Sequence, residues 1–198
     1  MDTIRLIIVA VGGQGNLLAS KVLGEAALLA GIPVRMSEIH GMAQRGGVVE
    51  SAIVMGGAQS NIISDGEADI LLGFEPAETL RALGKCKRDT VVITNMAPLP
   101  PFTVAIGKGV YPDLSRVQAL LTSKVKRLIA FDALAAAKQA GHVMTLNMVL
   151  LGALIQTGLV PITPDQVKEA IQTKTKSGTA AMNVRAFDLG YAAAQKAS

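Results

Sequence analysis

The hydrophobic pattern alternates between strands and helices over the first two thirds of the chain. Residues 4–11 are aliphatic apart from one arginine, which is typical of a strand covered on both faces, as in a parallel sheet. A glycine-rich turn follows at 12–15, and residues 17–30 have the spacing of a helix that ends at Gly31. A second strand over 33–39 completes a β–α–β unit, whose crossover is expected to be right-handed.

The remaining segments continue this order and then become helical. Strands are predicted over 48–55, 69–74, 90–95 and 128–131, with Gly56-Gly57 as a candidate hairpin turn after the first of them. Helices are predicted over 75–83, 113–123, 133–140, 146–158, 164–173 and 180–196, and the proline-rich residues 97–101 form a stiff connector. The chain is therefore predicted to be α/β, with an open, mostly parallel sheet in a Rossmann-like three-layer sandwich and a helical C-terminal portion. Its 198 residues suit a single domain, over 1–198.

Composition adds an expectation about the surface. Half of the residues are hydrophobic and 17% are charged, whereas an average soluble domain has roughly 25% charged residues. We therefore expect another subunit to cover part of the surface. The net charge is +4, with basic stretches at 85–88 and 124–127 that we interpret as solvated turns, and aromatic residues amount to 3%. With so few rings on which bases could stack, nucleic-acid binding is disfavoured.

Two further features bear on redox chemistry and on location. Cys86 is the single cysteine, and an iron–sulfur cluster or a structural zinc site needs about four ligands, so we expect this chain to hold neither. The N-terminus lacks the basic start and the cleavage site of a signal peptide. Residues 143–160 carry no charge and are about long enough to span a bilayer, but polar residues such as Asn147 and Gln156 favour a buried or interface helix. We expect no membrane association and a cytoplasmic protein.

The first candidate site is the turn between the first strand and the first helix. Gly12, Gly13, Gln14 and Gly15 stand where backbone N–H groups and the helix dipole favour an anion. The strict dinucleotide fingerprint is not met, because Leu18 occupies the position of its third glycine. Glu38 stands where a ribose-binding acid would be, which leaves a nucleotide-binding alternative open. A second alternative is that the glycines only tighten the turn.

The second candidate site is the loop after the second strand, over 38–47. In an open α/β sheet it leaves the same carboxyl edge as the glycine turn, and that edge is where ligands bind. Arg45 would hold a carboxylate or a phosphate there, or it would pair with Glu38 or Glu50. We predict binding residues in this loop at His40, Gly41, Gln44, Arg45, Gly46 and Gly47.

A complete catalytic apparatus is not visible in the sequence. There is no Ser/His/Asp grouping, no Walker loop, no metal-ligand spacing and no thiamine-type magnesium motif, and His142 beside a helix start is interpreted as structural. The chain is therefore expected to be one component of a larger enzyme. A stand-alone Rossmann-type nucleotide-binding or regulatory module is the alternative from another class.

Both glycine-rich loops carry a family resemblance. Val11-Gly-Gly-Gln-Gly-Asn-Leu-Leu-Ala-Ser20 and Ser37-Glu-Ile-His-Gly-Met-Ala-Gln-Arg-Gly-Gly47 together resemble the gamma subunit or domain of 2-oxoacid:ferredoxin oxidoreductases, in particular of the indolepyruvate type. Further matches extend over nearly the whole chain, at 66–69, 100–101, 111–112, 132–133, 147–153 and 183–187. Ala10, where the family has Gly, and Asn16, where it has an aliphatic residue or Thr, depart from the pattern without removing a charged group.

The resemblance implies a division of labour between subunits. A partner alpha subunit would carry thiamine diphosphate, magnesium and [4Fe–4S] clusters, coenzyme A would take the acyl group as co-substrate, and electrons would pass to ferredoxin. The two loops of this chain would then meet coenzyme A phosphates or the partner, and the chain alone would be inactive. Gamma subunits of pyruvate, 2-oxoglutarate or 2-oxoisovalerate enzymes share this domain and remain alternatives.

Overall fold

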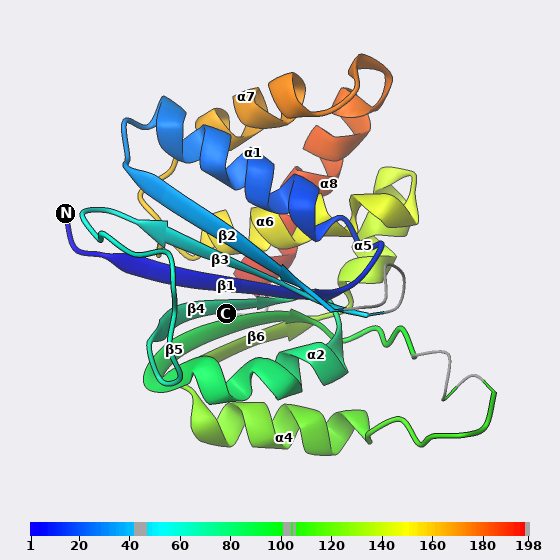
Figure 1. Cartoon of the computed structure of the whole chain (residues 1–198). Helices are drawn as coiled ribbons and strands as arrows, with labels where there is room; N and C mark the ends of the chain where they lie inside the picture. The colour runs from blue at the N-terminus through cyan, green and yellow to red at the C-terminus, as the bar shows by residue number, and fades with distance from the viewer. Residues whose placement is uncertain (42–46, 101–103, 105, 197–198) are drawn as a thin grey trace.

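The computed structural model describes residues 1–41, 47–100, 104 and 106–196, and within them six strands and seven α-helices form a layered α/β fold (Figure 1). The strands are β1 (Ile4–Val11), β2 (Val34–His40), β3 (Val48–Met55), β4 (Ala68–Gly73), β5 (Cys86–Asn95) and β6 (Arg127–Phe131). The helices are α1 (Asn16–Leu29), α2 (Pro76–Arg81), α4 (Leu114–Lys124), α5 (Ala133–Ala140), α6 (Leu146–Gln156), α7 (Pro164–Lys174) and α8 (Ser177–Lys196). These bounds follow the predicted ones closely, and the predicted fold class is confirmed.

The sheet has the order β2-β3-β1-β4-β5-β6. β1, β4, β5 and β6 pair in parallel, whereas β3 is antiparallel to both β1 and β2. The predicted β–α–β unit is therefore split, because β3 lies between its two strands. The expected hairpin at Gly56-Gly57 is wrong for the same reason: both edges of β3 are already hydrogen-bonded, so the chain passes on to β4 on the far side of β1.

The interpretation of residues 85–88 as a solvated turn is also wrong. β5 begins at Cys86, which pairs with Ala68 of β4. The Thr90 hydroxyl accepts a hydrogen bond from the Lys87 backbone N–H (2.8 Å) and donates one to the Ala68 carbonyl (2.5 Å), and the Lys87 ammonium pairs with the Asp69 carboxylate. These bonds continue the strand through a polar segment. The other basic stretch spans the end of α4 and the start of β6.

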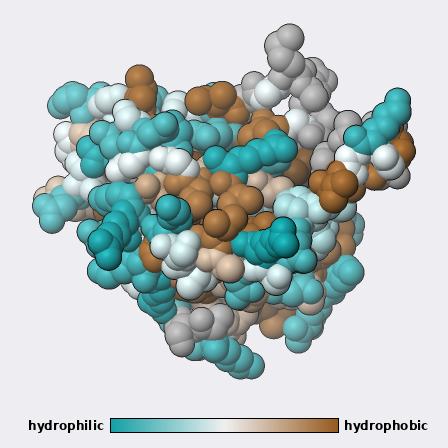
Figure 2. Space-filling model, turned by 90° about the horizontal axis from the view of Figure 1, so that it is seen from below, coloured by the Kyte–Doolittle hydropathy of each residue, from teal (hydrophilic) through white to brown (hydrophobic). Residues whose placement is uncertain are grey.

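Helices cover both faces of the sheet because its central strands are apolar on both sides. Along β1, Leu6, Ile8 and Ala10 pack toward the layer of α1 and α5–α8, whereas Ile7 and Val9 belong to a smaller core on the opposite face, where α2 and α4 lie (Figure 1). Seen from the α2 and α4 side, an apolar area near the middle of the molecule is bordered by hydrophilic side chains (Figure 2).

The uncharged segment 143–160 supplies the central helix of the larger layer. Nearly every residue of α6 is buried, which confirms the prediction of a buried helix. Among the described helices, none combines the length and the hydropathy needed to cross a membrane. The helix ends also follow local rules: Asp113 caps α4, and Thr163 forms a capping box with Gln166 at the start of α7.

Candidate functional site

The two predicted loops meet at the carboxyl edge of the sheet. The Gly12 backbone N–H donates a hydrogen bond to the Gly47 carbonyl (2.8 Å), and the Gly41 N–H donates one to the Val48 carbonyl (2.9 Å). Because β3 runs antiparallel to β1, its first residue lies beside the last residue of β1, where Val48 pairs with Val11. The glycine turn and the end of the second loop are thus joined through their backbones.

Gln14 holds the glycine turn in place through its side chain. Its Oε1 accepts a hydrogen bond from the Val11 N–H (2.8 Å), and its Nε2 donates one to the Phe74 carbonyl (3.2 Å) at the end of β4. The Asn95 amide donates to the same carbonyl (3.1 Å). One backbone oxygen therefore connects the ends of three parallel strands. With both ends of its amide engaged, the Gln14 side chain fixes the shape of the turn.

The N-terminus of α1 presents backbone donors beside this turn. Gly15 caps the helix with a left-handed backbone (φ 80°), contributes no side-chain hydrogen bond, and no acidic residue stands in the first turn. The buried Asn16 side chain is engaged by the Ser51 hydroxyl (3.1 Å) and the Val49 carbonyl (3.4 Å). A cavity of about 290 Å³ lies here, lined by Val11, Gly12, Gly13, Gly15, Asn16, Leu17 and Val49. Uncapped N–H groups at the positive end of a helix favour an anion.

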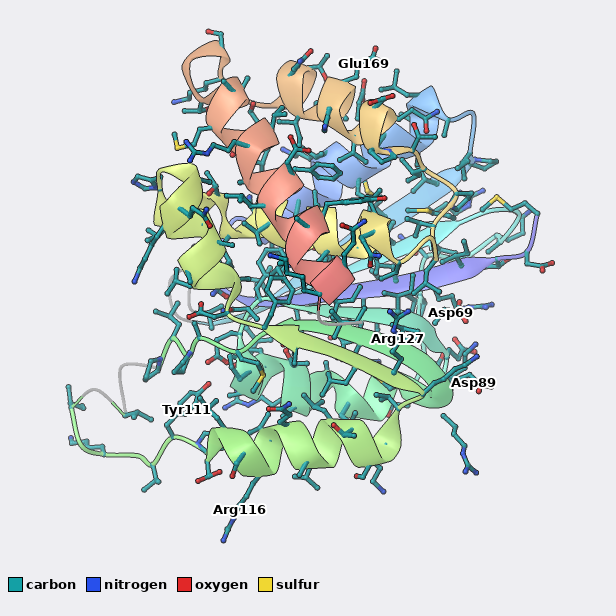
Figure 3. The ribbon with its side chains drawn as sticks, turned by 180° about the vertical axis from the view of Figure 1, so that it is seen from behind. Asp69, Asp89, Tyr111, Arg116, Arg127 and Glu169 are labelled. Atoms are coloured by element: carbon teal, nitrogen blue, oxygen red, sulfur yellow. The ribbon has the colours of Figure 1, made fainter. Side chains whose placement is uncertain are left out.

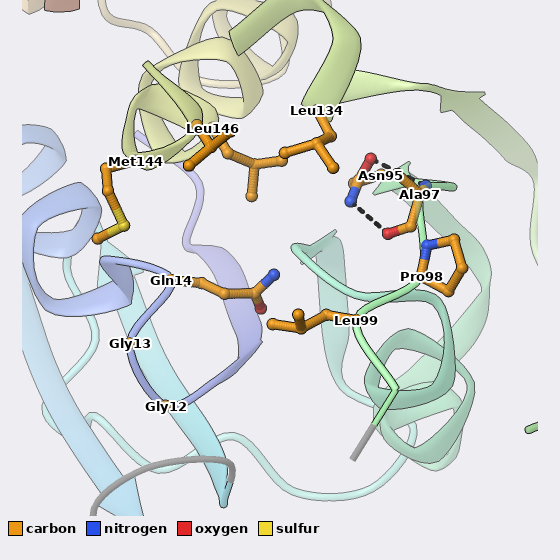
Figure 4. Close-up of a pocket in the computed structure, with 11 residues that line it drawn as sticks. Gly12, Gly13, Gln14, Asn95, Ala97, Pro98, Leu99, Leu134, Met144 and Leu146 are labelled. Carbon is orange, nitrogen blue, oxygen red and sulfur yellow. Dashed lines mark hydrogen bonds between the residues drawn. The ribbon is translucent and has the colours of Figure 1, made fainter. Parts of the chain in front are cut away.

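A second cavity of about 310 Å³ also borders Gly12, Gly13 and Gln14 (Figure 4). Apart from Asn95, its other walls are mostly apolar: Ala97, Pro98, Leu99, Leu134, Val143, Met144 and Leu146. Asn95 is 2% exposed, and its Oδ1 accepts from the Ala97 and Ala133 N–H groups (both 3.1 Å), so it fixes the proline-rich connector against α5. The cavity suits an apolar group placed next to the candidate anion site.

Sequence reasoning missed the walls of this second cavity. Its apolar residues come from the connector, α5 and the start of α6, and none of them differs in type from an ordinary core residue. The available signal was positional: Asn95 and the residues after it follow a parallel strand, at the edge where ligands bind.

The other predicted site residues have different outcomes. The backbone of His40 ends β2, and Gln44, Arg45 and Gly46 lie outside the described residues, so their binding roles stay predictions. Glu38 lies on β2, which β3 separates from the glycine turn by two strand spacings, or about 10 Å. At that separation Glu38 is not beside the glycine turn, where an acid that binds the ribose of a nucleotide would have to be. The His142 Nδ1 accepts a hydrogen bond from the Met144 N–H (3.1 Å), which confirms its structural role. In the described ranges, no cluster of three His, Cys, Asp or Glu residues could hold a metal ion.

The sheet places the chain among open α/β proteins, a class in which ligands commonly bind where parallel strands end. Residues 5–193 match the family described as Pyruvate ferredoxin/flavodoxin oxidoreductase. The chain is 40% identical over 198 residues to the indolepyruvate oxidoreductase subunit IorB of Pyrococcus horikoshii, covering 99% of this chain and 98% of that protein. A subunit of the same name from Methanothermobacter thermautotrophicus is 40% identical over 190 residues, covering 96% and 97%.

Solved structures show the same fold. The gamma subunit of a keto/oxoacid ferredoxin oxidoreductase from Geobacter sulfurreducens PCA superposes with a TM-score of 0.71 at 22% identity, covering 98% of this chain and 99% of that chain. The chain belongs to the pyruvate ferredoxin/flavodoxin oxidoreductase family. This confirms the predicted resemblance and favours an oxidoreductase subunit that acts within a complex over a stand-alone nucleotide-binding module.

Proposed function

We propose that this chain is the gamma-type subunit of an indolepyruvate (aryl-pyruvate) ferredoxin oxidoreductase. Residues 1–198 would form one catalytic domain of a cytoplasmic hetero-oligomer that decarboxylates a 2-oxoacid oxidatively, transfers the acyl group to coenzyme A and passes electrons to ferredoxin. The full-length identity to indolepyruvate oxidoreductase subunits supports the substrate class. The observation that carries the site is the Gly12 to Gly47 hydrogen bond, because it joins both glycine-rich loops beside the uncapped start of α1.

The geometry is compatible with coenzyme A phosphates at this edge. Around Gly13, nothing described lies within 4 Å of the place that a Cβ would take, so an anion can approach the backbone closely. The adjoining apolar cavity would receive an uncharged part of the same ligand. Arg45, in the second loop, would add a guanidinium for a phosphate. Thiamine diphosphate, magnesium and [4Fe–4S] clusters are assigned to the partner alpha subunit, where thiamine would supply the electron sink for decarboxylation.

The same edge of the sheet has the properties of a docking surface for that partner. Six large apolar side chains around the two loops and cavities are 36–65% exposed: Leu17, Ile39, Val48, Leu99, Val143 and Met144. We call these six residues the apolar rim. Exposed apolar side chains grouped on one part of a surface are typical of protein interfaces. A partner that binds to the apolar rim would cover part of the surface, as the low content of charged residues led us to expect.

Expression with and without the partner subunit tests the proposal. The isolated chain is expected to be colourless and inactive, and the complex is expected to reduce ferredoxin with indolepyruvate and coenzyme A. Iron–sulfur absorbance or decarboxylation by the chain alone would refute the division of labour. A higher kcat/KM for pyruvate, 2-oxoglutarate or 2-oxoisovalerate than for indolepyruvate would instead assign the chain to one of those enzymes. Thermal stabilisation by NAD or FAD alone would favour the nucleotide-binding module.

The role of Arg45 is tested separately in the assembled complex. Arg45→Ala is expected to raise the KM for coenzyme A or to weaken assembly while the chain stays folded. Arg116→Ala is the matched control. Arg116 is exposed on α4 and points away from the molecule at the bottom of Figure 3. Equal kinetics and equal assembly for both variants would leave Arg45 as a structural pair of a nearby carboxylate.

A further inference from the structure

An acidic cavity near the carboxyl edge has no role in the site described above. It has a volume of about 180 Å³ and shares Leu99 with the apolar cavity. Its polar wall consists of Glu75, Glu78, Arg81 and Tyr111. Its apolar wall consists of Val11, Ala77, Leu99, Val104, Val110 and Pro112 together with Gly109. At about 30 Å³ per water molecule, the volume equals roughly six waters, which is enough for one long side chain.

Glu75 forms a rigid, negatively charged part of this wall. It is 1% exposed, and its Oε2 accepts hydrogen bonds from the Ala77 N–H (2.7 Å) and the Glu78 N–H (3.1 Å) at the start of α2. Its Oε1 accepts from the Leu99 N–H (3.2 Å) and from the Tyr111 hydroxyl. Four donors therefore occupy the carboxylate. Because the Tyr111 O–H donates to Glu75, the phenol oxygen can only accept a further bond.

Glu78 is the incomplete member of the cluster. It is 8% exposed, its Oε1 lies 3.3 Å from the Arg81 Nη1, and its Oε2 is buried without a hydrogen-bond partner in the part of the chain that the structure describes. Burial, reinforced by the nearby Glu75, raises the pKa of this carboxyl, and Arg81 opposes the rise. A buried acceptor without a donor is costly, so an incoming donor would be favoured here.

The chemistry of the wall selects an organic cation over a metal ion. Glu75 has no free lone pair directed away from its four donors, and a metal site would need more ligands than Glu78 and Tyr111 supply. Arg81 is the only cation of the described wall, and its side chain is 65% exposed. Exposed ion pairs contribute little, so a better-buried cation can replace it.

We propose that this cavity receives a lysine ammonium or arginine guanidinium presented by the partner subunit, a step that rests on the proposed function. Two observations favour a protein side chain as the source. The lining includes two exposed side chains, Val110 (95% exposed) and Leu99 of the apolar rim (47% exposed), so the cavity adjoins the surface on which the partner would dock. Buried acceptors and apolar groups in the same lining match a side chain with an aliphatic stem and a charged end.

Glu78→Gln in the full chain tests this by removing the charge at constant shape. The dissociation constant for the partner subunit is measured at low and high ionic strength. The variant is expected to bind roughly tenfold or more weakly at both ionic strengths, mainly through faster dissociation, since a buried charge pair is lost and salt screens such pairs little. The matched control is Glu169→Gln, since Glu169 is exposed on α7, far from Tyr111 in Figure 3, and it is expected to bind like the wild type.

Arg81→Met provides the opposite test. It removes the internal competitor for Glu78, so the free chain should become less stable while partner binding becomes tighter or stays equal.

Cooperative unfolding of each variant establishes that it is folded. Wild-type affinity for Glu78→Gln overturns the inference alone, whereas a wild-type chain that binds no partner overturns the proposed function with it. Millimolar n-butylammonium provides a last test. If it stabilises the isolated wild type but not Glu78→Gln, and if both chains bind the partner subunit with equal affinity, the occupant is a free amine. That result would also overturn the inference.

Discussion

The side-chain amide of Asn147 donates a hydrogen bond of 3.1 Å to the carbonyl oxygen of Gly15, across 132 residues of sequence. This bond connects the start of α6 to the start of α1. A Cβ on Gly15 would lie 2.6 Å from the Asn147 Nδ2, so a side chain at that position would force the Asn147 amide to move. The buried helix α6 is therefore linked directly to the glycine turn and to the candidate anion site beside it.

Gly15→Ala is expected to destabilise the chain more than Gly13→Ala does. Both glycines have positive φ angles (80° and 104°), so each alanine incurs roughly 1–3 kcal/mol of backbone strain. Only position 15 adds a collision, because no described atom surrounds a Cβ at Gly13. Urea unfolding of both variants measures the difference. Adding Asn147→Ala to Gly15→Ala should recover part of the loss, and equal costs at the two positions would contradict the close approach.

The packing of α6 against α8 depends on two glycines. A Cβ on Gly152 would lie 2.0 Å from the Phe187 carbonyl oxygen, and one on Gly190 would lie 1.8 Å from the Val149 carbonyl oxygen. Alanine at either position must push backbone away from backbone, so we expect a loss of about 3 kcal/mol or more of unfolding free energy. Gly178→Ala, in the first turn of α8 with open space around it, is the control and should be neutral or slightly stabilising. A small effect at Gly152 or Gly190 would mean that the helices are not in backbone contact.

Local pattern was sufficient to predict most elements of the fold. The alternation of Leu6, Ile7, Ile8 and Val9 between two cores is a property of residue type and strand geometry, so burial on both faces was readable from the sequence. Strand order was not readable, because the insertion of β3 between β1 and β2 depends on pairing between distant segments. The polar start of β5 was missed because the bonds that hold Lys87 there, to Thr90 three residues along the strand and to Asp69 of β4, follow no hydrophobic pattern.

In the candidate site, too, some features could be predicted from the sequence and others could not. The common edge of the two glycine loops could be predicted because all parallel strands end there, and the Gly12 to Gly47 bond agrees with it. The Phe74 carbonyl accepts hydrogen bonds from the side-chain amides of both Gln14 and Asn95. This arrangement could not be predicted, since Asn and Gln residues occur throughout the chain. The acidic cavity was also missed, because Glu75 before a proline signals a helix cap and nothing in its neighbours signals a cavity.

Cys86 is expected to react slowly with alkylating reagents. Burial in β5 raises the pKa of its thiol to about 11, and a hydrogen bond with the Thr90 side chain opposes the rise only in part. At pH 8.5 the thiolate would be roughly a hundredfold rarer than in an ordinary cysteine, and the alkylation rate should fall accordingly. Iodoacetamide labelling followed across pH should show an inflection near the raised pKa. The urea-unfolded chain serves as the control, and rapid labelling of the folded chain at pH 8.5 would contradict the burial of the thiol.

Glu78 should make the stability of the isolated chain depend on pH. Burial raises the pKa of its carboxyl above the ordinary value of 4.5, so the folded state binds this proton more tightly than the unfolded state does. The resulting stabilisation is fully present below about pH 4.5 and is lost as the pH rises through the folded-state pKa. Among the described residues, the other charged or titratable groups that face the cavity are Glu75, Arg81 and Tyr111, and a substitution of Glu78 leaves them in place.

Glu78→Gln removes this titration, so its unfolding free energy relative to the wild type should increase from pH 4.5 to pH 7.5. Denaturant unfolding at several pH values measures the trend, with Glu169→Gln as a control that should show none. A constant difference across this range would mean that Glu78 titrates normally. In the assembled complex a cation beside Glu78 would stabilise its charged form, and the dependence of stability on pH at this residue should then disappear.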